Sequence, residues 1–222
     1  MIGAVLFDVD GTLIDSNDLH ATAWREAFVH FGVDLPLGVI RGQIGKGGDN
    51  LIPTLLPKEL VEERQEEIDH YRGELFKREY LPRVVPFPGV RELFERLKAD
   101  GRKIVLASSA KGAEVAFHLG VIGGEDLVDG TTSADDVEHS KPCPDIFAAA
   151  LEKVKPLGPD EVVVVGDSPF DVEAAKKLGM KVIGVRSGGF PDEVLRKAGA
   201  DELYDGPADL LRNYDTSLIA RA

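Results

Sequence analysis

The first apolar run of the chain and the polar turn that follows it read Ala4-Val5-Leu6-Phe7-Asp8-Val9-Asp10-Gly11-Thr12-Leu13. A short, continuous apolar run that ends in turn residues is typical of a strand buried on both faces of a parallel sheet. Asp8 and Asp10 follow this strand at positions i and i+2, so their side chains point to the same side if the chain stays extended. The carboxyl ends of parallel strands form the ligand crevice of open sheets. Asp-Gly is also a tight-turn signal, so the alternative is a hairpin with a solvated Asp10.

Three later stretches, residues 103–107, 162–165 and 181–185, are apolar runs of the same kind. Weaker strands are expected near residues 127–131 and 202–204. Between the runs, apolar residues recur at helical spacing, as in Val90, Leu93, Phe94 and Leu97, and in Ile146, Phe147, Ala150, Leu151 and Val154. This alternation predicts an α/β fold with a doubly wound, mostly parallel sheet.

Residues 16–81 break the alternation, because their apolar residues recur at helical spacing without a convincing strand. A stiff return linker is then indicated by Pro82, Pro86, Pro88 and Gly89. We therefore expect two domains. Residues 1–15 and 82–222 would form the α/β core, and residues 16–81 an inserted helical domain.

The composition is that of a globular protein, with 43% apolar and 29% charged residues in a chain of 222. The sequence contains no run of about 18 apolar residues, so a membrane span is not expected. The short apolar run at the N-terminus lacks a preceding basic stretch, which favours a strand over a signal peptide. The single cysteine, Cys143, cannot form an intramolecular disulfide, which favours a cytoplasmic location.

The net charge of −13 argues against nucleic acid as a partner, because binding a phosphate backbone needs an excess of Lys and Arg. An anionic substrate would need positive charge gathered locally, from a metal, a lysine or helix N-termini. The acidity itself is typical of a solvated surface.

A second carboxylate motif follows the apolar run at residues 162–165, where Asp167 lies at the predicted end of the strand. Ser168 and Pro169 match the N-cap and first residue of a helix, and Asp171 would complete a capping box. That explanation suffices for Asp171 and leaves Asp167 unexplained. Asp8, Asp10 and Asp167 would repel one another in a cluster unless a hard cation such as Mg²⁺ neutralised them.

Two further signals are weak when taken separately. Ser108 follows the apolar run at residues 103–107 and precedes a helical segment, where serine is a common N-cap. Lys141 precedes two prolines that set a turn, and it could be an ordinary exposed lysine.

Taken in order, these four segments resemble the signature motifs of the haloacid dehalogenase-like superfamily. The first motif corresponds to residues 8–13, the second to Ser108, the third to Lys141, and the fourth to Asp167 with Asp171. The inserted helical segment resembles the cap of the subgroup that carries it after the first motif. Residues 15–24 are most similar to β-phosphoglucomutases and related sugar-phosphate and phosphoglycolate phosphatases.

The resemblance implies a role for each motif residue. Asp8 would be the nucleophile that forms an aspartyl-phosphate. Asp10 would protonate the leaving oxygen and later deprotonate water. The carboxylates of Asp8 and Asp167 and the carbonyl of Asp10 would bind Mg²⁺. Ser108 and Lys141 would bind the phosphoryl oxygens, and Asp171 would support these groups without binding the metal directly.

Five other residues are candidate substrate contacts: Gly11, Thr12, Ser109, Lys46 and His20. Lys46 lies in the Gly-rich, basic segment 41–49, which is either a specificity loop facing the site or a flexible helix connection. The segment lacks the spacing of a Walker A loop. His20 is either a residue that packs within the cap or a substrate contact.

The resemblance implies an Mg²⁺-dependent phosphatase that acts on a small phosphorylated metabolite. A phosphomutase of the β-phosphoglucomutase type shares every core residue and is the alternative. A binding module with an inactive site is a third interpretation, disfavoured by the complete set of motif residues. Dehalogenases proper lack the second aspartate, so the presence of Asp10 disfavours carbon–halogen cleavage. The motifs leave the substrate and the oligomeric state open.

Overall fold

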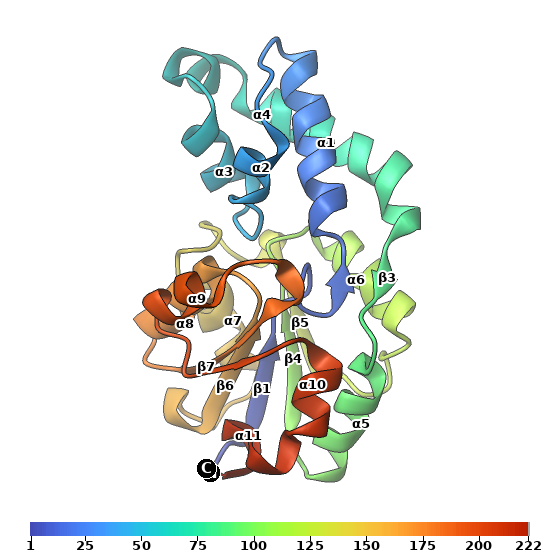
Figure 1. Ribbon diagram of the computed structural model, residues 1–222, viewed down its shortest axis with the longest axis vertical. Coiled ribbons are helices and arrows are strands. Elements are labelled where there is room, and N and C mark those ends of the chain that lie inside the picture. Colours follow the sequence, from blue (N-terminus) through green and yellow to red (C-terminus); the bar gives the residue numbers. More distant parts are fainter. Residues whose placement is uncertain (222) are drawn as a thin grey trace.

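The computed structural model describes residues 1–221. Six parallel strands form one sheet in the order β5-β4-β1-β6-β7-β8 (Figure 1). Their bounds are β1 Ala4–Phe7, β4 Lys103–Ala107, β5 Gly130–Thr132, β6 Val162–Gly166, β7 Lys181–Val185 and β8 Glu202–Tyr204. The strand order reverses direction at β1, which is the arrangement of a doubly wound sheet. The predicted fold class is confirmed.

Strand β1 lies at the centre of the sheet, between β4 and β6. Phe7 is paired with Leu106 of β4 and with Val165 of β6, so three strands end at nearly the same level. All four residues of β1 are fully buried, which explains why the run is continuously apolar. The polar residues that follow the three strands are thereby brought to one edge of the sheet.

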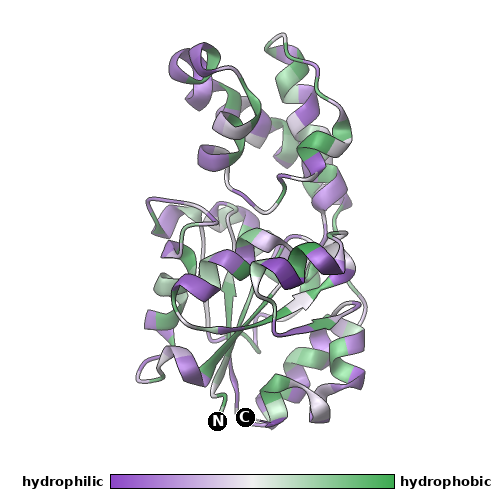
Figure 2. Ribbon diagram, turned by 60° about the vertical axis from the view of Figure 1, so that its left-hand side comes forward, coloured by the Kyte–Doolittle hydropathy of each residue, from purple (hydrophilic) through white to green (hydrophobic). Residues whose placement is uncertain are grey.

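Helices cover both faces of the sheet (Figures 1 and 2). One face packs against α5 (Val90–Ala99), α6 (Gly112–Ile122), α10 (Pro207–Arg212) and α11 (Leu218–Arg221). The other packs against α7 (Asp145–Lys153), α8 (Pro169–Lys177) and α9 (Asp192–Ala198). The strands are among the most apolar ribbons of Figure 2, whereas the helices alternate between apolar and polar residues, as expected of helices with one face on the core. Short 3-10 turns lie at Ala134–Asp136, Pro159–Glu161, Arg186–Gly188 and Tyr214–Thr216.

Four helices lie beyond the carboxyl edge of the sheet, at the top of Figure 1. They are α1 (Asn17–His30), α2 (Leu37–Arg41), α3 (Gly48–Leu55) and α4 (Lys58–Leu75), and α4 continues into a π-helical segment, Phe76–Tyr80, and a 3-10 turn, Leu81–Arg83. These helices enclose a hydrophobic cluster of their own, which includes Trp24, Phe28, Leu51 and Ile68. The antiparallel strands β2 (Ile14–Asp15) and β3 (Val85–Pro86) pair where the segment leaves the sheet and returns. The boundaries of a cap domain at residues 16 and 81 stay a prediction.

The expected strand at residues 127–131 is displaced in the structure, where β5 begins at Gly130. Leu127 and Val128 instead close a turn, because both of their N–H groups donate to the carbonyl of Gly124. Their apolar side chains pack against the core from this turn. Among residues 1–221, no helix combines the length and the apolar character needed to cross a membrane.

Candidate active site

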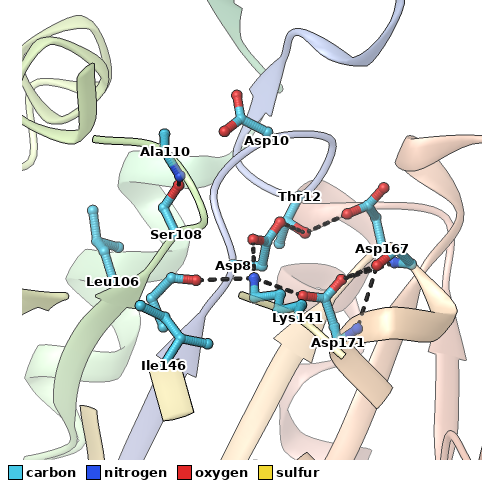
Figure 3. A network of polar contacts seen from close by, with 12 residues as sticks. Asp8, Asp10, Thr12, Leu106, Ser108, Ala110, Lys141, Ile146, Asp167 and Asp171 are labelled. Carbon is cyan, nitrogen blue, oxygen red and sulfur yellow. Dashed lines mark hydrogen bonds and ion pairs between the residues drawn. The ribbon is translucent and has the colours of Figure 1, made fainter. Parts of the chain in front are cut away.

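Asp8 follows β1 directly, at the carboxyl end of the central strand, and is 6% exposed. Its Oδ1 lies 2.5 Å from the ammonium nitrogen of Lys141, and its Oδ2 accepts a hydrogen bond of 3.1 Å from the hydroxyl of Thr12. Figure 3 shows the carboxylate between these two groups. The nucleophile predicted from the sequence is therefore buried, oriented and paired with a cation.

Lys141 is fully buried, although the sequence allowed an exposed turn lysine. Its ammonium donates to Asp8 and, at 3.0 Å, to the carbonyl of Ala107, and it lies 2.7 Å from Asp171 Oδ1. Burial lowers the pKa of Lys141, but the two carboxylates outweigh it and raise the pKa above its ordinary value. Lys141 is therefore a permanent cation beneath the site.

Asp167 follows β6 as the sequence predicts, and it is 1% exposed. Its Oδ1 lies 3.3 Å from the Thr12 hydroxyl, and its Oδ2 accepts a hydrogen bond of 2.9 Å from Asn17 Nδ2. The backbone closes tightly around this carboxylate, because a Cβ on Gly188 would lie 1.6 Å from Oδ2 and one on Gly11 2.5 Å from it. Gly11 adopts φ +82°, which favours glycine, and its lack of a side chain allows the backbone to approach Asp167. A contact between Gly11 and a substrate stays a prediction.

The capping box predicted for α8 is confirmed. The side chain of Ser168 accepts from the Asp171 N–H, and Asp171 Oδ2 accepts from the Ser168 N–H and hydroxyl, at 3.0 and 2.6 Å. This leaves Asp171 Oδ1 for Lys141. Asp171 therefore fixes the start of α8 and the lysine at the same time.

Three carboxylates, Asp8, Asp167 and Asp171, bring oxygen atoms within 4.8 Å of one another. Burial, helped by the charges of Asp171 and Asp10, raises the pKa of Asp8 to about 7 against the opposing effect of Lys141. Burial, Asp171 and Asp8 also raise the pKa of Asp167 well above its ordinary value. Asp8 and Asp167 are buried oxygen donors with raised pKa values, and they fit a hard divalent cation such as Mg²⁺, which would replace the protons.

Asp10 belongs to a second group of side chains, apart from the first (Figure 3). Its Oδ1 accepts a hydrogen bond of 2.5 Å from Ser16 and lies 3.0 Å from His20 Nε2. Burial raises the pKa of Asp10, but His20, His118 and the hydrogen bonds from His20 and Ser16 outweigh it and lower the pKa. Asp8 and Asp10 both line the same pocket, but their carboxylates have different hydrogen-bond partners.

His20 lies at the junction of the sheet and the helices beyond it. Its ring stacks on Phe76 with centroids 3.9 Å apart, and its Nδ1 lies 2.6 Å from Arg72 Nη2. Glu114 Oε1 of α6 is 3.8 Å from His20 Nε2. His20 therefore packs within the helical segment and also contacts Asp10, and its contact with a substrate stays a prediction.

The two serines after β4 have different surroundings. Ser108 is 1% exposed, and its hydroxyl oxygen accepts from the N–H of Ala110 at 3.0 Å. It is not the N-cap of a helix, since α6 begins at Gly112 with Lys111 as its N-cap. Ser109 lines the pocket above the site, and its buried hydroxyl has no hydrogen-bond partner among the described residues.

Lys46 does not contact either carboxylate group. Its ammonium donates to Gln43 at 2.7 Å and to Thr54 at 3.2 Å, and it lies over the ring of Phe170 at 4.8 Å from the centroid. Lys46 also lines the pocket, so its role toward a substrate stays a prediction.

A pocket of about 550 Å³ lies between the helical segment and the sheet edge. Asp8 and Asp10 line it from the sheet side, and the opposite wall includes Trp24, Arg72 and the loop at residues 44–49. Sequence reasoning did not single out Asn17, Arg72, Glu114 or Gly188 as site residues. All four reach the site by tertiary packing, and their local sequence carries no signal of it.

The family model for haloacid dehalogenase-like hydrolases matches residues 5–185. This chain belongs to that family. The family predicted from the motifs is thereby confirmed, with all four motifs inside the matched region.

A phosphorylated carbohydrates phosphatase from Thermotoga maritima is 31% identical over 209 residues, which are 94% of this chain and 96% of that protein. The protein SUPPRESSOR OF QUENCHING 1 from Arabidopsis thaliana is 31% identical over 211 residues, but this chain spans only 20% of its length. The crystal structure of a hydrolase from Pseudomonas syringae is similar with a TM-score of 0.90 and 30% identity, covering 97% of this chain and 99% of that one. The chain is a hydrolase of this family, and the phosphatase among its relatives supports the predicted class, a phosphoric monoester hydrolase.

Proposed function

We propose that this protein is an Mg²⁺-dependent phosphatase that hydrolyses a small phosphomonoester, such as a sugar phosphate or phosphoglycolate, through an aspartyl-phosphate on Asp8. One observation carries the proposal. Asp8 is a buried carboxylate at the floor of a pocket, with Lys141 2.5 Å from Oδ1 and the Asp167 carboxylate beside it. This arrangement orients a nucleophile and provides positive charge for a phosphoryl group.

The carboxylates of Asp8 and Asp167 and the backbone carbonyl of Asp10 would hold the metal. Mg²⁺ would neutralise negative charge on the transferring phosphoryl group. The carboxylates of Asp8 and Asp167 bring oxygen atoms within 4.8 Å of each other, and oxygen donors suit this ion.

In the first step, a carboxylate oxygen of Asp8 bonds to phosphorus and the bond from phosphorus to the ester oxygen breaks. Asp10 gives a proton to the departing oxygen. The low pKa of Asp10 in the free protein rises when the negatively charged phosphoryl group binds nearby, as any like charge raises it. Lys141 and Ser108 bind the phosphoryl oxygens during the transfer.

In the second step, a water molecule attacks the phosphorus of the aspartyl-phosphate and gives its proton to Asp10. The bond between phosphorus and the Asp8 oxygen breaks, which releases inorganic phosphate and restores the Asp8 carboxylate. Residues 16–81 would act as the cap that closes over the pocket, because their helices form its far wall.

The test is a phosphate-release screen over sugar phosphates, phosphoglycolate and nucleotides, each with Mg²⁺ and with EDTA. We expect release from at least one small phosphomonoester that depends on Mg²⁺. The same activity in excess chelator would refute the metal assignment.

One control separates hydrolysis from isomerisation. β-Glucose 1-phosphate with a trace of glucose 1,6-bisphosphate should yield inorganic phosphate without efficient formation of glucose 6-phosphate. Rapid isomerisation, followed by phosphorus NMR, would establish the phosphomutase instead.

A further inference from the structure

Two adjacent residues at the start of α3, Asp49 and Asn50, bind the backbone of the loop that carries Lys141. The N–H of Ser140 donates to Asp49 Oδ2 at 3.0 Å. Asn50 Nδ2 donates to the carbonyl of Ser140 at 3.0 Å and lies 3.4 Å from the carbonyl of Lys141. The helical segment therefore contacts both the donor and the acceptor of one core peptide segment.

The glycine-rich segment at residues 44–49, which leads into α3, approaches the core closely. A Cβ on Gly47 would lie 2.1 Å from Ser140 Oγ, and a Cβ on Gly45, at φ +108°, would lie 2.7 Å from Ser168 Oγ. Ser140 precedes Lys141, and Ser168 follows Asp167. The glycines of this segment thus permit an approach to two loops that carry site residues.

The Lys141 side chain points from this loop to the nucleophile. Its ammonium is fixed by Asp8, Ala107 and Asp171, while its backbone carbonyl is contacted by Asn50. A fully buried lysine has little room to compensate for a shift of its backbone. A movement of the helical segment away from the core would therefore be transmitted to the group that orients Asp8.

We propose that Asp49 and Asn50 are positioning residues that couple closure of the helical segment over the pocket to the placement of Lys141 against Asp8. The pair, called here the Asp49–Asn50 latch, does not touch the reacting atoms. It acts by fixing the Ser140–Lys141 backbone when the pocket is closed. This inference rests on the proposed function, since it assigns a catalytic purpose to Lys141.

The first experiment compares four variants with the wild type. Asn50→Asp keeps the size of the side chain and sets an acceptor against two carbonyl oxygens. Asp49→Ala removes the acceptor for the Ser140 N–H, whereas Asp49→Asn keeps an oxygen that can accept it. Asn213→Asp is the matched control, because Asn213 Nδ2 also donates to a backbone carbonyl, that of Asp209 at 2.9 Å, on the exposed surface away from the pocket.

We expect kcat/KM to fall about 10- to 100-fold in Asn50→Asp and Asp49→Ala, because these variants lose one to three hydrogen bonds. Asn50→Asp also adds repulsion between its carboxylate and the two carbonyl oxygens. Asp49→Asn should restore activity to within about threefold of the wild type. The loss should be the same for an alkyl phosphate and for p-nitrophenyl phosphate, because Lys141 and Asp8 act on both. Asn213→Asp should show neither effect.

A double-mutant cycle distinguishes this role from a merely structural one. In a Lys141→Ala background, Asn50→Asp should reduce kcat/KM by less than about twofold, because the group that it positions is gone. A full additional loss in that background would overturn the proposal. Equal thermal stability of Asn50→Asp and Asn213→Asp would exclude general unfolding as the cause of the single-variant loss.

The second experiment needs no enzymatic activity. Amide hydrogen exchange at Ser140 should accelerate in Asp49→Ala and return toward the wild-type rate in Asp49→Asn, because Asp49 accepts the Ser140 N–H. Unchanged exchange would overturn the latch even in an active enzyme. A wild-type protein that releases no phosphate but shows the exchange pattern would refute the proposed function and leave the contact itself established.

Discussion

His20 Nε2 lies 3.0 Å from Asp10 Oδ1, while Arg72 Nη2 lies 2.6 Å from Nδ1 on the other side of the ring. A guanidinium group can only donate, so Nδ1 must accept and the ring proton lies on Nε2. His20 therefore donates to Asp10. Because Ser16 donates to the same oxygen, Oδ2 of Asp10 is left for the proposed proton transfer. The Nε2 proton also prevents His20 from serving as a metal ligand with Asp10 and Glu114.

Replacing Asp10 or His20 should therefore impair mainly substrates with a poor leaving group. An alkyl phosphate leaves as a strongly basic alkoxide, whereas p-nitrophenyl phosphate leaves as a stabilised phenolate. We expect Asp10→Ala to slow aspartyl-phosphate formation about 10³-fold for the alkyl ester and much less for the aryl ester. His20→Ala should show the same preference with a smaller loss, about 10- to 100-fold, and His20→Gln, which keeps a donor, should recover part of it.

Rapid-quench measurement of the aspartyl-phosphate with both esters decides this. Breakdown of the intermediate should be equally slow for both esters in Asp10→Ala, because the same water attacks the same acyl phosphate. If formation slows equally for the two esters, Asp10 is not the general acid.

Asp8→Asn should abolish turnover while the protein stays folded. The amide has nearly the shape of the carboxylate but lacks the attacking charge, and covalent catalysis is worth several powers of ten in rate. Circular dichroism should confirm the fold, and phosphate release should fall below about 1% of the wild-type rate. Residual activity above that level would assign the nucleophile to another group.

Mg²⁺ should bind more tightly as the pH rises through about 7, the raised pKa of Asp8. In the metal-free protein, Asp8 keeps a proton that the unfolded chain loses near pH 4, so its contribution to the free energy of unfolding falls as pH rises from about 4 to 7. The raised pKa of Asp167 acts in the same direction. Mg²⁺ must displace these protons, so its apparent dissociation constant should rise up to about tenfold per pH unit below 7 for each proton released.

Thermal unfolding with and without excess Mg²⁺ checks this dependence. The stabilisation by Mg²⁺ should be larger at about pH 8 than at about pH 6. Asp167→Asn, which removes one of the two proposed charged ligands, should reduce the stabilisation at both pH values. A stabilisation that does not vary with pH would contradict proton displacement.

The sequence predicted the core of the fold because its strands are buried on both faces. Such strands must be continuously apolar, and the polar residues after them must gather at one edge, so Asp8, Ser108 and Asp167 could be placed from local patterns. The strand expected at residues 127–131 was misplaced, because an apolar residue that packs from a turn has the same local pattern as one in a strand.

Sequence reasoning was weaker where a side chain contacts residues distant in the chain. Lys141 was compatible with an exposed turn, yet it is the most buried cation of the site because Asp8, 133 positions away, pairs with it. Lys46 lies in a segment that could be a specificity loop or a helix connection, and the local sequence does not predict that its ammonium donates to Gln43 and Thr54. Glu114 carries no motif at all, and its place beside His20 follows only from the packing of α6.

The position of Glu114 beside Asp10 and His20 predicts that Glu114 affects substrate choice. Its Oε1 has no hydrogen-bond partner within residues 1–221, and it lines the pocket within 4.8 Å of the reactive atoms of Asp10 and His20. In the proposed mechanism the departing oxygen lies next to Asp10, so the first carbons of the leaving group would pass close to Glu114. A hydroxyl there can donate to the carboxylate, whereas a carboxylate there is repelled by it. Two like charges about 5 Å apart repel by about 3 kcal/mol at an effective dielectric constant of about 20.

The wild-type enzyme should therefore prefer a polyol phosphate such as sorbitol 6-phosphate over 2-phosphoglycolate, whose carboxylate lies one carbon from the ester oxygen. Glu114→Gln keeps the size of the side chain and removes the charge, so it should shift the ratio of the two kcat/KM values about 10- to 100-fold toward 2-phosphoglycolate.

Glu125→Gln, at an exposed residue just beyond α6, is the matched control and should leave the ratio unchanged. p-Nitrophenyl phosphate, which has no carboxylate, should be hydrolysed equally by all three proteins. A wild-type enzyme that hydrolyses 2-phosphoglycolate as efficiently as the polyol phosphate would show that the leaving group does not pass Glu114.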